Sequence, residues 1–281
     1  MNNNDKQKKF WSEKGGLKWV EDKAVLDKRL NRFGQLALSK LKLKKEMKVL
    51  DLGCGTGETS KLLADIVGDK GEVCGLDISE PMISFAQKHY SINKNISFKV
   101  SDIQLDKIEQ NLFERAFSRH GLMFFSDPIK AFKNIYDSLK NSGVLSFTCF
   151  QEPKKNLWHS IPTEIFSNYL EINDLQSSKA PSPFAFQNDK YIQEILLKSG
   201  FQNIEINGYE ENTEWFLDLS PKEATEMYLR TSPAMATNIK NLSISILNKI
   251  KSDMEKEYSK FYINNNIVFP SAVWIVKAQK E

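Results

Sequence analysis

The stretch that decides the fold is Val49-Leu50-Asp51-Leu52-Gly53-Cys54-Gly55-Thr56-Gly57. It begins within a short apolar run, Met47 to Leu52, and then places three glycines at alternate positions. The residues that follow have apolar side chains at helical spacing, at Leu62, Leu63, Ile66 and Val67. The pattern predicts a strand, a tight turn and a helix. Glycine suits such a turn because the absence of a side chain lets the backbone approach a ligand closely.

Outward from this turn, short apolar runs alternate with helical patterns along most of the chain. Before it, residues 22–42 carry one apolar stripe, which predicts a helix that packs on a sheet. The predicted strands are 47–52, 72–77, 96–101, 113–118, 144–150, 201–206 and 272–278. Strands that alternate with helices indicate an α/β fold, with a mostly parallel seven-stranded sheet and helices on both faces.

The predicted organisation is a single core that carries two insertions. Residues 1–45 form a leading segment, 46–150 the core, and 188–208 and 269–281 two returns to it. The insertions, 151–187 and 209–268, do not follow the alternation. The second contains Ile246, Ile250, Met254, Tyr258 and Phe261 at helical spacing, so we expect the insertions to form a helical cap.

Composition excludes several classes of protein. Of the 281 residues, 41% are hydrophobic and 27% are charged, as in ordinary globular proteins. The net charge of +3 is too small to indicate a nucleic-acid partner. There is no apolar run of about 18 residues, so we expect a cytoplasmic protein without a membrane partner. The cysteines Cys54, Cys74 and Cys149 lack the spacing of a metal site, and the sequence leaves the oligomeric state open.

The glycine turn offers groups of both polarities to a ligand. A helix N-terminus presents unpaired N–H groups, whereas Asp51 at the strand end can face an ammonium or sulfonium group. This combination suits a cofactor that carries an amino acid. In a dinucleotide-binding G-x-G-x-x-G motif a third glycine would stand at position 58, where this chain has Glu58. NAD and FAD are therefore disfavoured.

The segment from Asp51 to Gly57 resembles the first motif of the Rossmann-like (class I) S-adenosylmethionine-dependent methyltransferases, and the similarity covers roughly residues 20–150. It implies S-adenosylmethionine as the cofactor and an antiparallel last strand. The stretch Phe117 to Phe125 with Asp127-Pro128, together with Trp11 and Trp19-Val20, is similar to a bacterial branch that acts on small molecules.

The resemblance implies a set of cofactor-binding residues: Asp51, Gly53, Cys54, Gly55, Gly57, Asp77, Ile78, Met82, Asp102, Ile103, Ser118 and Trp19. Asp77 would accept the ribose hydroxyls. Asp102 would receive the adenine amino group, and the backbone N–H of Ile103 would read the ring. Each aspartate could instead be a turn or N-cap residue, but their occurrence at successive strand ends favours the cofactor.

The other residues of this set surround the same ligand. Ile78 and Met82 would flank the adenine, and Ser118 would lie beside the methionine portion. Trp11 and Trp19 either cover the cofactor, where a ring face attracts the sulfonium, or only pack the leading helix on the sheet.

Candidate catalytic residues follow the fourth predicted strand. His120 is either a general base for a hydroxyl or amine acceptor or a partner of a loop carbonyl. Arg119 binds an acidic acceptor or forms a salt bridge with Asp127 or a surface acid. Trp158 and His159, at the start of the first insertion, are further candidates for an acceptor pocket.

The function predicted from the sequence is in-line transfer of a methyl group from S-adenosylmethionine to an unidentified small molecule. The insertions, which are rich in aromatic residues, would fold over the strand ends and enclose the acceptor. Two alternatives stay open: a non-catalytic S-adenosylmethionine-binding regulatory protein, and a methyltransferase acting on RNA or protein. The residues after Ser118 lack the Asn/Asp-Pro-Pro-aromatic motif of amino-directed nucleic-acid enzymes.

Overall fold

The computed structural model describes residues 3–170, 179–231 and 242–281. The chain divides into two compact units. The first comprises residues 1–151, 178–209 and 273–281, and the second comprises 152–177 and 210–272. The glycine turn and the strand ends that follow it all belong to the first unit.

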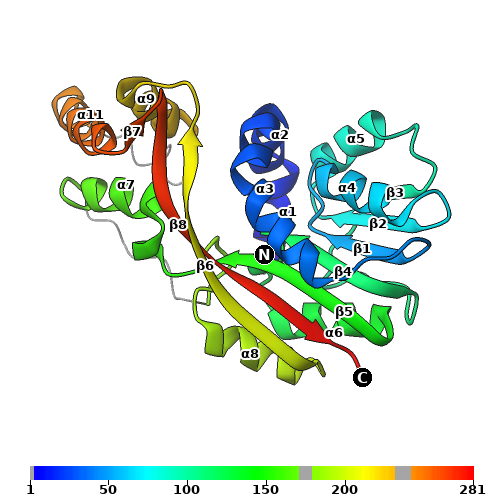
Figure 1. Ribbon diagram of the computed structural model, residues 1–281. Helices are drawn as coiled ribbons and strands as arrows, with labels where there is room; N and C mark the ends of the chain where they lie inside the picture. Colours follow the sequence, from blue (N-terminus) through cyan, green and yellow to red (C-terminus); the bar gives the residue numbers. More distant parts are fainter. Residues whose placement is uncertain (1–2, 171–178, 232–241) are drawn as a thin grey trace. The chain divides into compact units, whose positions relative to one another are not determined.

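The first unit is built on a mostly parallel sheet (Figure 1). Its strands are β1 (Lys48–Leu52), β2 (Glu72–Asp77), β3 (Ile96–Val100), β4 (Phe113–Arg119), β5 (Leu139–Phe150), β6 (Gln202–Phe216) and β8 (Asn266–Gln279). Their order across the sheet is β3-β2-β1-β4-β5-β8-β6. Strands β1 to β5 pair in parallel, and β8 pairs antiparallel with β5. The predicted α/β fold class and the antiparallel last strand are confirmed.

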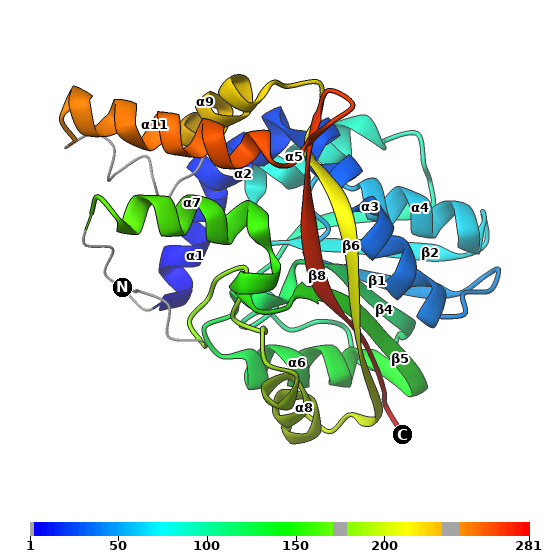
Figure 2. The same ribbon diagram turned by 60° about the vertical axis from the view of Figure 1, so that its left-hand side comes forward.

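Helices cover both faces of this sheet (Figure 2). One face carries α3 (Lys23–Lys40), α4 (Glu58–Val67) and α5 (Glu80–His89), and the other carries α6 (Pro128–Ser138) and α8 (Asp189–Lys198). The leading helices are α1 (Asn3–Ser12) and α2 (Lys14–Glu21), and a short 3-10 helix, η1 (Leu122–Phe124), follows β4.

The core of the first unit lies between these layers and the sheet. On the α3 face, Phe33 and Ala37 are fully buried, and the Ser146 hydroxyl donates to the Ala37 carbonyl at 2.8 Å. On the opposite face, the rings of Phe132 and Phe147 meet at 5.6 Å between centroids. The apolar stripe predicted for residues 22–42 is thus the buried side of α3.

The second unit contains helices and the outer parts of β6 and β8. Its helices are η2 (Pro153–Lys155), α7 (Leu157–Ser167), α9 (Pro221–Thr231) and α11 (Ile244–Ser259), and the two-residue strand β7 (Tyr262–Ile263) pairs with β8. The rings of Trp158 and Trp215 stack at 4.2 Å, and the Trp215 indole donates to the Ser271 hydroxyl at 2.7 Å. The predicted helical pattern is that of α11, which buries Ile250, Met254 and Tyr258.

The structure corrects the predicted strands in two respects. Within the described residues the sheet has eight strands instead of seven because β7 adds to it. Strand β6 continues to Phe216, well into the segment predicted as a helical insertion, 209–268, and β8 begins at Asn266, three residues before the end of that segment. Strand β6 lies at the sheet edge and carries mostly polar residues, so its apolar pattern was detectable only as far as residue 206. Within the two predicted insertions, residues 171–178 and 232–241 lie outside the described residues.

Candidate functional site

The glycine turn joins β1 to α4 at the carboxyl edge of the sheet. All three glycines have left-handed backbone angles, with φ of 65° at Gly53, 55° at Gly55 and 87° at Gly57. The backbone N–H groups of Gly53 and Cys54 donate to the carbonyl of Leu76 at 2.8 and 3.1 Å. The turn is therefore tied to the end of β2, as expected from the parallel pairing of the two strands.

The three glycines of the turn have different surroundings. A Cβ at Gly53 would lie 2.9 Å from Gly121 Cα, and one at Gly57 would lie 2.8 Å from the Phe98 ring. A Cβ at Gly55 would meet only Met82 Sδ and Trp19 Nε1, each at 3.7 Å, an ordinary contact distance. Gly53 and Gly57 are thus required by the packing of the protein itself, whereas Gly55 leaves open space beside the backbone.

Asp51, at the end of β1, is completely buried. Its Oδ2 accepts hydrogen bonds from the hydroxyls of Thr59 and Ser60 at 2.7 and 2.6 Å, both from the first turn of α4. Its Oδ1 has no hydrogen-bond partner among the described residues. Burial raises the pKa of Asp51 to about 6, against the opposing hydrogen bonds and the charge of Arg119. A buried acceptor without a partner is unfavourable, so this oxygen is suited to a cationic ligand.

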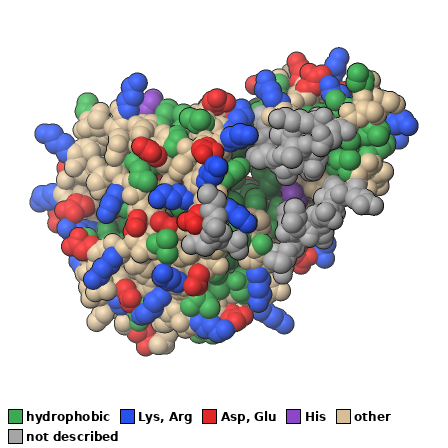
Figure 3. All heavy atoms as spheres, turned by 180° about the vertical axis from the view of Figure 1, so that it is seen from behind, with side chains coloured by type: hydrophobic (Ala, Val, Ile, Leu, Met, Phe, Trp, Pro, Cys, Tyr) green, Lys and Arg blue, Asp and Glu red, His purple; other side chains and the backbone are tan. Residues whose placement is uncertain are grey.

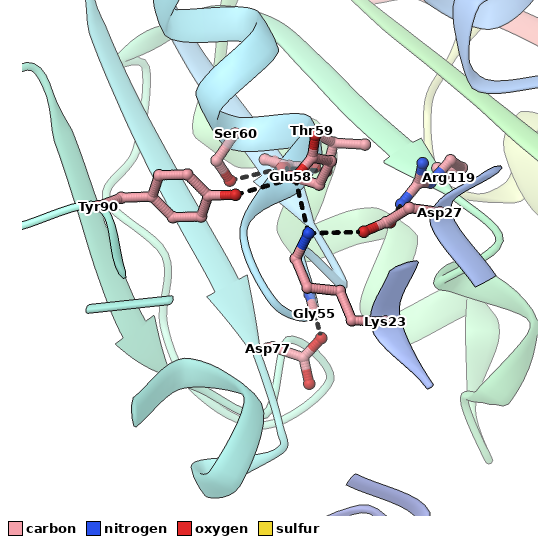
Figure 4. Close-up of polar contacts among 10 residues, drawn as sticks. Lys23, Asp27, Gly55, Glu58, Thr59, Ser60, Asp77, Tyr90 and Arg119 are labelled. Carbon is pink, nitrogen blue, oxygen red and sulfur yellow. Dashed lines mark hydrogen bonds and ion pairs between the residues drawn. The ribbon is translucent and has the colours of Figure 1, made fainter. Parts of the chain in front are cut away.

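Asp77, at the end of β2, contacts the glycine turn directly. Its Oδ2 accepts from the Gly55 N–H at 2.9 Å (Figure 4). Its Oδ1 accepts from the Ser79 N–H at 2.9 Å. Burial raises the pKa of this carboxyl to about 6, although both N–H groups favour its charged form. Each oxygen keeps a further lone pair for a hydroxyl donor.

Asp102 follows β3 and is partly buried. Its Oδ1 accepts from the Gln104 N–H at 3.1 Å, and its Oδ2 accepts from the side-chain amide of Asn4 on α1. Burial raises the pKa of this carboxyl. The next residue, Ile103, is buried, and its carbonyl accepts from the Asn134 amide at 2.8 Å.

The remaining predicted residues around the turn have mainly apolar or structural contacts. Met82 is buried at the start of α5, where the Ser79 hydroxyl caps the helix by accepting from the Met82 N–H. Cys54 is a buried thiol whose pKa is raised by burial, so it stays protonated. Ser118 is also buried, and its hydroxyl donates to the Leu52 carbonyl at 2.7 Å, which joins β4 to β1. Ile78 is partly buried after β2.

Aromatic side chains from the leading helices lie beside the turn. The Trp11 ring makes edge contacts with Trp19 and Phe124, at centroid distances of 6.1 and 5.2 Å. The Ser79 hydroxyl donates to the Trp11 carbonyl at 2.7 Å. Trp11 therefore does pack the leading helices on the first unit, while Trp19 also reaches the open space at Gly55.

Arg119, at the end of β4, has a partner that was not predicted. Its guanidinium forms an ion pair with Asp27 on α3, and both side chains are largely buried, at 11% and 14% exposure. The predicted partner Asp127 instead caps α6 by accepting from the Lys130 N–H at 3.1 Å. Arg119 comes from β4 and Asp27 from α3, which packs on the sheet. The spacing of residues along the sequence therefore could not predict this pair.

The Arg119–Asp27 pair belongs to a longer network of ion pairs and hydrogen bonds, which was not predicted from the sequence. Lys23 bridges Asp27 and Glu58 at 2.9 and 2.8 Å, and the Tyr90 hydroxyl donates to Glu58 at 2.9 Å (Figure 4). The i, i+4 spacing of Lys23 and Asp27 was the available signal for one of these contacts. The network links α3 to the first residue of α4.

A pocket of about 400 Å³ lies beside this network, between α3 and α4. Its lining includes Asp27, Lys28, Asn31, Gly34, Gln35, Leu38, Glu58, Thr59, Leu62, Phe117 and Arg119. Charges of both signs line it, so the pocket favours neither a purely anionic nor a purely cationic ligand.

His120 is buried in an aromatic cluster of the first unit. Its ring stacks on Phe150 at 4.3 Å and meets Phe33 edge-on at 6.1 Å. Neither ring nitrogen has a hydrogen-bond partner among the described residues, so the predicted loop-carbonyl contact is absent there. Burial, followed by the charge of Arg119, lowers the pKa of His120 to about 3. The backbone is left-handed, with φ of 56°, which is uncommon for a residue other than glycine.

The other candidates lie in the second unit. Trp158 stacks on Trp215, as described above, and meets His159 edge-on at 5.6 Å. Burial lowers the pKa of His159 to about 4. Of the aromatic residues in the two predicted insertions, Phe166 and Trp215 are buried, and Phe184 is buried within the first unit, so these three rings serve mainly as core.

Comparison with known proteins places the chain in a family. A family described as "Methyltransferase domain" matches residues 43–195, more than half of the chain. The juvenile hormone acid O-methyltransferase of Bombyx mori is 32% identical over 57% of this chain and 58% of its own length. A demethylmenaquinone methyltransferase of Staphylococcus epidermidis is 25% identical over 61% of this chain and 75% of its own length.

Solved structures show the same fold at low sequence identity. The YcgJ protein from Bacillus subtilis covers 89% of this chain and 99% of its own, with a TM-score of 0.59 and 15% identity. The phosphoethanolamine N-methyltransferase 2 of Haemonchus contortus, in complex with phosphomonomethylethanolamine and S-adenosylhomocysteine, has a TM-score of 0.53 and 19% identity. It covers 89% of this chain and 53% of its own.

The chain belongs to the methyltransferase-domain family, and its fold is that of the class I, S-adenosylmethionine-dependent methyltransferases. The predicted family, fold and cofactor class are thereby confirmed. The site fits such a cofactor on its own geometry as well. The space at Gly55 lies beside the Asp77 carboxylate, and the neighbouring strand ends with Asp51, whose Oδ1 has no partner among the described residues.

Proposed function

We propose that this protein binds S-adenosylmethionine at the glycine turn and transfers its methyl group to a small-molecule acceptor. The observation that carries the proposal is the space at Gly55, the one position of the turn where a side chain would meet no protein atom closer than 3.7 Å. That space is bordered by Trp19 and Met82 and lies next to the Asp77 carboxylate. A glycine at this position leaves that space to a ligand, and its left-handed φ of 55° also favours glycine.

Each predicted residue then has a defined role. Asp51 attracts the ammonium group through its Oδ1, Asp77 accepts the ribose hydroxyls, and Asp102 accepts the adenine amino group. The peptide groups of Gly53, Cys54 and Gly57 form the turn, with Ile78, Met82 and Ile103 around the adenine, and Ser118 beside the methionine portion. Trp19 covers the turn, so its ring excludes water from the ligand.

The cofactor supplies an electrophilic methyl group on a sulfonium. In-line transfer would place this methyl group on the nucleophilic atom of the acceptor, with the new bond replacing the carbon–sulfur bond and S-adenosylhomocysteine as the leaving group. The proton lost by the acceptor passes to solvent. Because His120 has a pKa near 3, it is a weak base at neutral pH, so we assign the acceleration to alignment of the two reactants rather than to proton abstraction.

A small-molecule acceptor is supported by the relatives and by the surface. The names of similar proteins refer to juvenile hormone acid, demethylmenaquinone and malonyl-[acyl-carrier protein]. These acceptors differ so much from one another that none of them is assigned to this chain. Basic and acidic side chains intermingle on the face in Figure 3, without the single-sign stripe that nucleic-acid binding requires. Among the described residues, no helix has the length and hydropathy to cross a bilayer.

Calorimetry with S-adenosylmethionine, S-adenosylhomocysteine and NAD tests the cofactor. We expect dissociation constants in the micromolar range or tighter for the first two ligands and no binding of NAD. Transfer of a labelled methyl group is then measured with demethylmenaquinone, a malonyl thioester and phosphoethanolamine, and with compounds identified by mass spectrometry of the purified protein. Absence of heat with both sulfur ligands would overturn the proposal, whereas turnover with any acceptor would dismiss the non-catalytic alternative.

We further propose that the second unit selects the acceptor, as expected of the predicted cap. The proposal is supported by the aromatic side chains of this unit, of which Trp158 and Tyr228 are only partly buried. Hydrogen exchange followed by mass spectrometry tests it. Backbone protection in 152–170 and 210–231 should rise when cofactor and acceptor bind together, and unchanged exchange would contradict it.

A further inference from the structure

The N-terminal helix α1 contacts the residue expected to recognise adenine. Asn4 is 4% exposed, and its side-chain amide donates to Oδ2 of Asp102, although the two residues lie 98 positions apart. Burying a carboxamide is unfavourable unless it is hydrogen-bonded, so the contact with Asp102 offsets the cost of burying the Asn4 side chain.

The contact fixes the orientation of the Asp102 carboxylate. The Gln104 N–H holds Oδ1 at 3.1 Å, and Asn4 holds Oδ2. A carboxylate held at one oxygen turns about its Cβ–Cγ bond, whereas one held at both oxygens keeps its plane. Two of its four lone-pair directions then remain for a ligand at a fixed angle.

Asn4 is itself held at its other end. Its Oδ1 accepts from the Ser126 hydroxyl at 3.4 Å, and that hydroxyl lies 3.1 Å from Oε1 of Gln104. The same Gln104 oxygen accepts from the Asp127 N–H at 2.8 Å. Asn4 is therefore part of a network that joins the end of β3 to the start of α6.

The rest of α1 is anchored independently of Asn4. At the far end of the helix, the Trp11 carbonyl accepts from Ser79, and the Trp11 ring contacts Phe124. Loss of the Asn4 amide should therefore leave the helix in place and change mainly the Asp102 carboxylate.

We propose that Asn4 is a positioning residue of the cofactor site, which orients the Asp102 carboxylate toward the amino group of adenine. The proposal rests on the proposed function, in which Asp102 accepts that group. It makes the N-terminal helix part of nucleobase recognition, and not only a cover over the site.

The experiment compares two ligands that differ in one group. S-adenosylhomocysteine is titrated into the protein by calorimetry, and so is its 6-deamino analogue, in which hydrogen replaces the adenine amino group. The wild-type protein should prefer the amino compound by about tenfold or more, the value of a hydrogen bond to a charged acceptor. The ratio of the two affinities is the readout, because general damage to the protein affects both ligands alike.

Asn4→Ala should weaken S-adenosylhomocysteine binding by roughly three- to tenfold and leave the deamino analogue within about twofold, so that the preference shrinks. Lys6→Ala, an exposed position on the same helix, is the matched control and should change neither affinity. In an Asp102→Ala background, Asn4→Ala should have no further effect on the ratio. Ser126→Ala, which frees the other end of Asn4, should shift the ratio in the same direction.

The outcomes separate this proposal from the one on which it rests. A wild-type protein that binds neither ligand would contradict the proposed function. If the wild type shows the preference but Asn4→Ala weakens both ligands equally, Asn4 only docks the helix, and the positioning role is wrong. An unchanged ratio in Asn4→Ala would overturn it as well.

Discussion

The carboxylate of Asp77 accepts a hydrogen bond from the backbone N–H of Gly55 at 2.9 Å, so the end of β2 supports the turn that follows β1. The parallel register places Leu52 opposite Leu76, one residue before Asp77. The same side chain is thus both a predicted ribose ligand and a structural part of the glycine turn.

Because of this double role, Asp77→Ala should lower the stability of the protein as well as its affinity for the cofactor. We expect S-adenosylhomocysteine affinity to fall by at least about tenfold and the free energy of unfolding to fall by about 1–3 kcal/mol, because two backbone N–H groups lose their acceptor. Calorimetry and urea unfolding measure the two effects. Asp69→Ala, at an exposed acid that follows α4, serves as the comparison. Full stability with weakened binding would show that the turn does not depend on Asp77.

The unequal surroundings of the glycines lead to a paired prediction. Gly55→Ala should abolish most cofactor binding, because its Cβ occupies the ligand space, while the left-handed backbone costs only about 1–2 kcal/mol of stability. Gly57→Ala should be less stable than Gly55→Ala, because its Cβ would also lie 2.8 Å from Phe98 and 3.0 Å from Ala86. Thermal unfolding and titration with S-adenosylhomocysteine check both variants. Equal affinity of Gly55→Ala and wild type would remove the main support for the site.

Cofactor affinity should depend on pH. Burial raises the pKa of Asp51 and of Asp77 from 3.8 to about 6, so both carboxyls are mostly neutral at pH 5 and mostly ionised at pH 7.5. The ionised forms attract the ammonium and accept the ribose hydroxyls, so S-adenosylhomocysteine should bind more tightly at pH 7.5. Titrations at pH 5, 6 and 7.5 test this, and Asp51→Asn should flatten the dependence. A wild-type affinity that is constant over this range would contradict the prediction.

The same raised pKa values affect the free protein in the opposite direction. Between about pH 4 and 6 the folded state keeps protons on Asp51 and Asp77 that the unfolded chain releases. Their contribution to the free energy of unfolding therefore falls as the pH rises through this window. Urea unfolding of wild type and Asp51→Asn without ligand separates this effect from cofactor binding.

The buried pair of Arg119 and Asp27 should matter for stability. Removing one partner leaves the other charge largely buried, so Asp27→Ala should lower the free energy of unfolding by roughly 2–4 kcal/mol. The double variant Asp27→Ala with Arg119→Met should recover part of that loss, because no unpaired charge remains. A double-mutant cycle by urea unfolding measures the coupling. A coupling energy near zero would show that the pair contributes nothing.

The local features of the fold and site were predictable from sequence, because they depend on neighbouring residues. The alternation of strands and helices places Asp51, Asp77 and Asp102 after successive strands, and parallel pairing brings strand ends to one edge. The spacing of the glycines predicted the turn, and the resemblance then implied Gly55 as a cofactor residue. Strand β6 was predicted too short because its edge position leaves both faces largely polar, so no periodic apolar signal extends beyond residue 206.

Long-range side-chain contacts were not predictable in this way. Arg119 and Asp27 lie 92 positions apart, and Asn4 and Asp102 lie 98 apart, so no local spacing links them. Each pair forms only when a helix from the leading segment lies over the sheet. Arg119 pairs with Asp27 instead of Asp127 because its side chain lies on the α3 side of the sheet. Only the folded structure shows on which side this side chain lies.

His120 provides the test of whether the protein uses a general base. The ring is 7% exposed, stacks on Phe150, and has a pKa lowered to about 3, so it should remain neutral from pH 5 to 8. Nuclear magnetic resonance of the three histidines follows this directly, since the signals missing from His120→Phe identify the residue. Phe keeps the aromatic contacts with Phe33 and Phe150, whereas His120→Ala removes them and should lose about 2–3 kcal/mol of stability.

Once an acceptor is known, His120→Phe should keep kcat within about tenfold of wild type. A fall of a hundredfold or more, with a wild-type kcat/KM that follows an ionisation near pH 6.5, would establish His120 as the base and refute the assignment of catalysis to alignment alone.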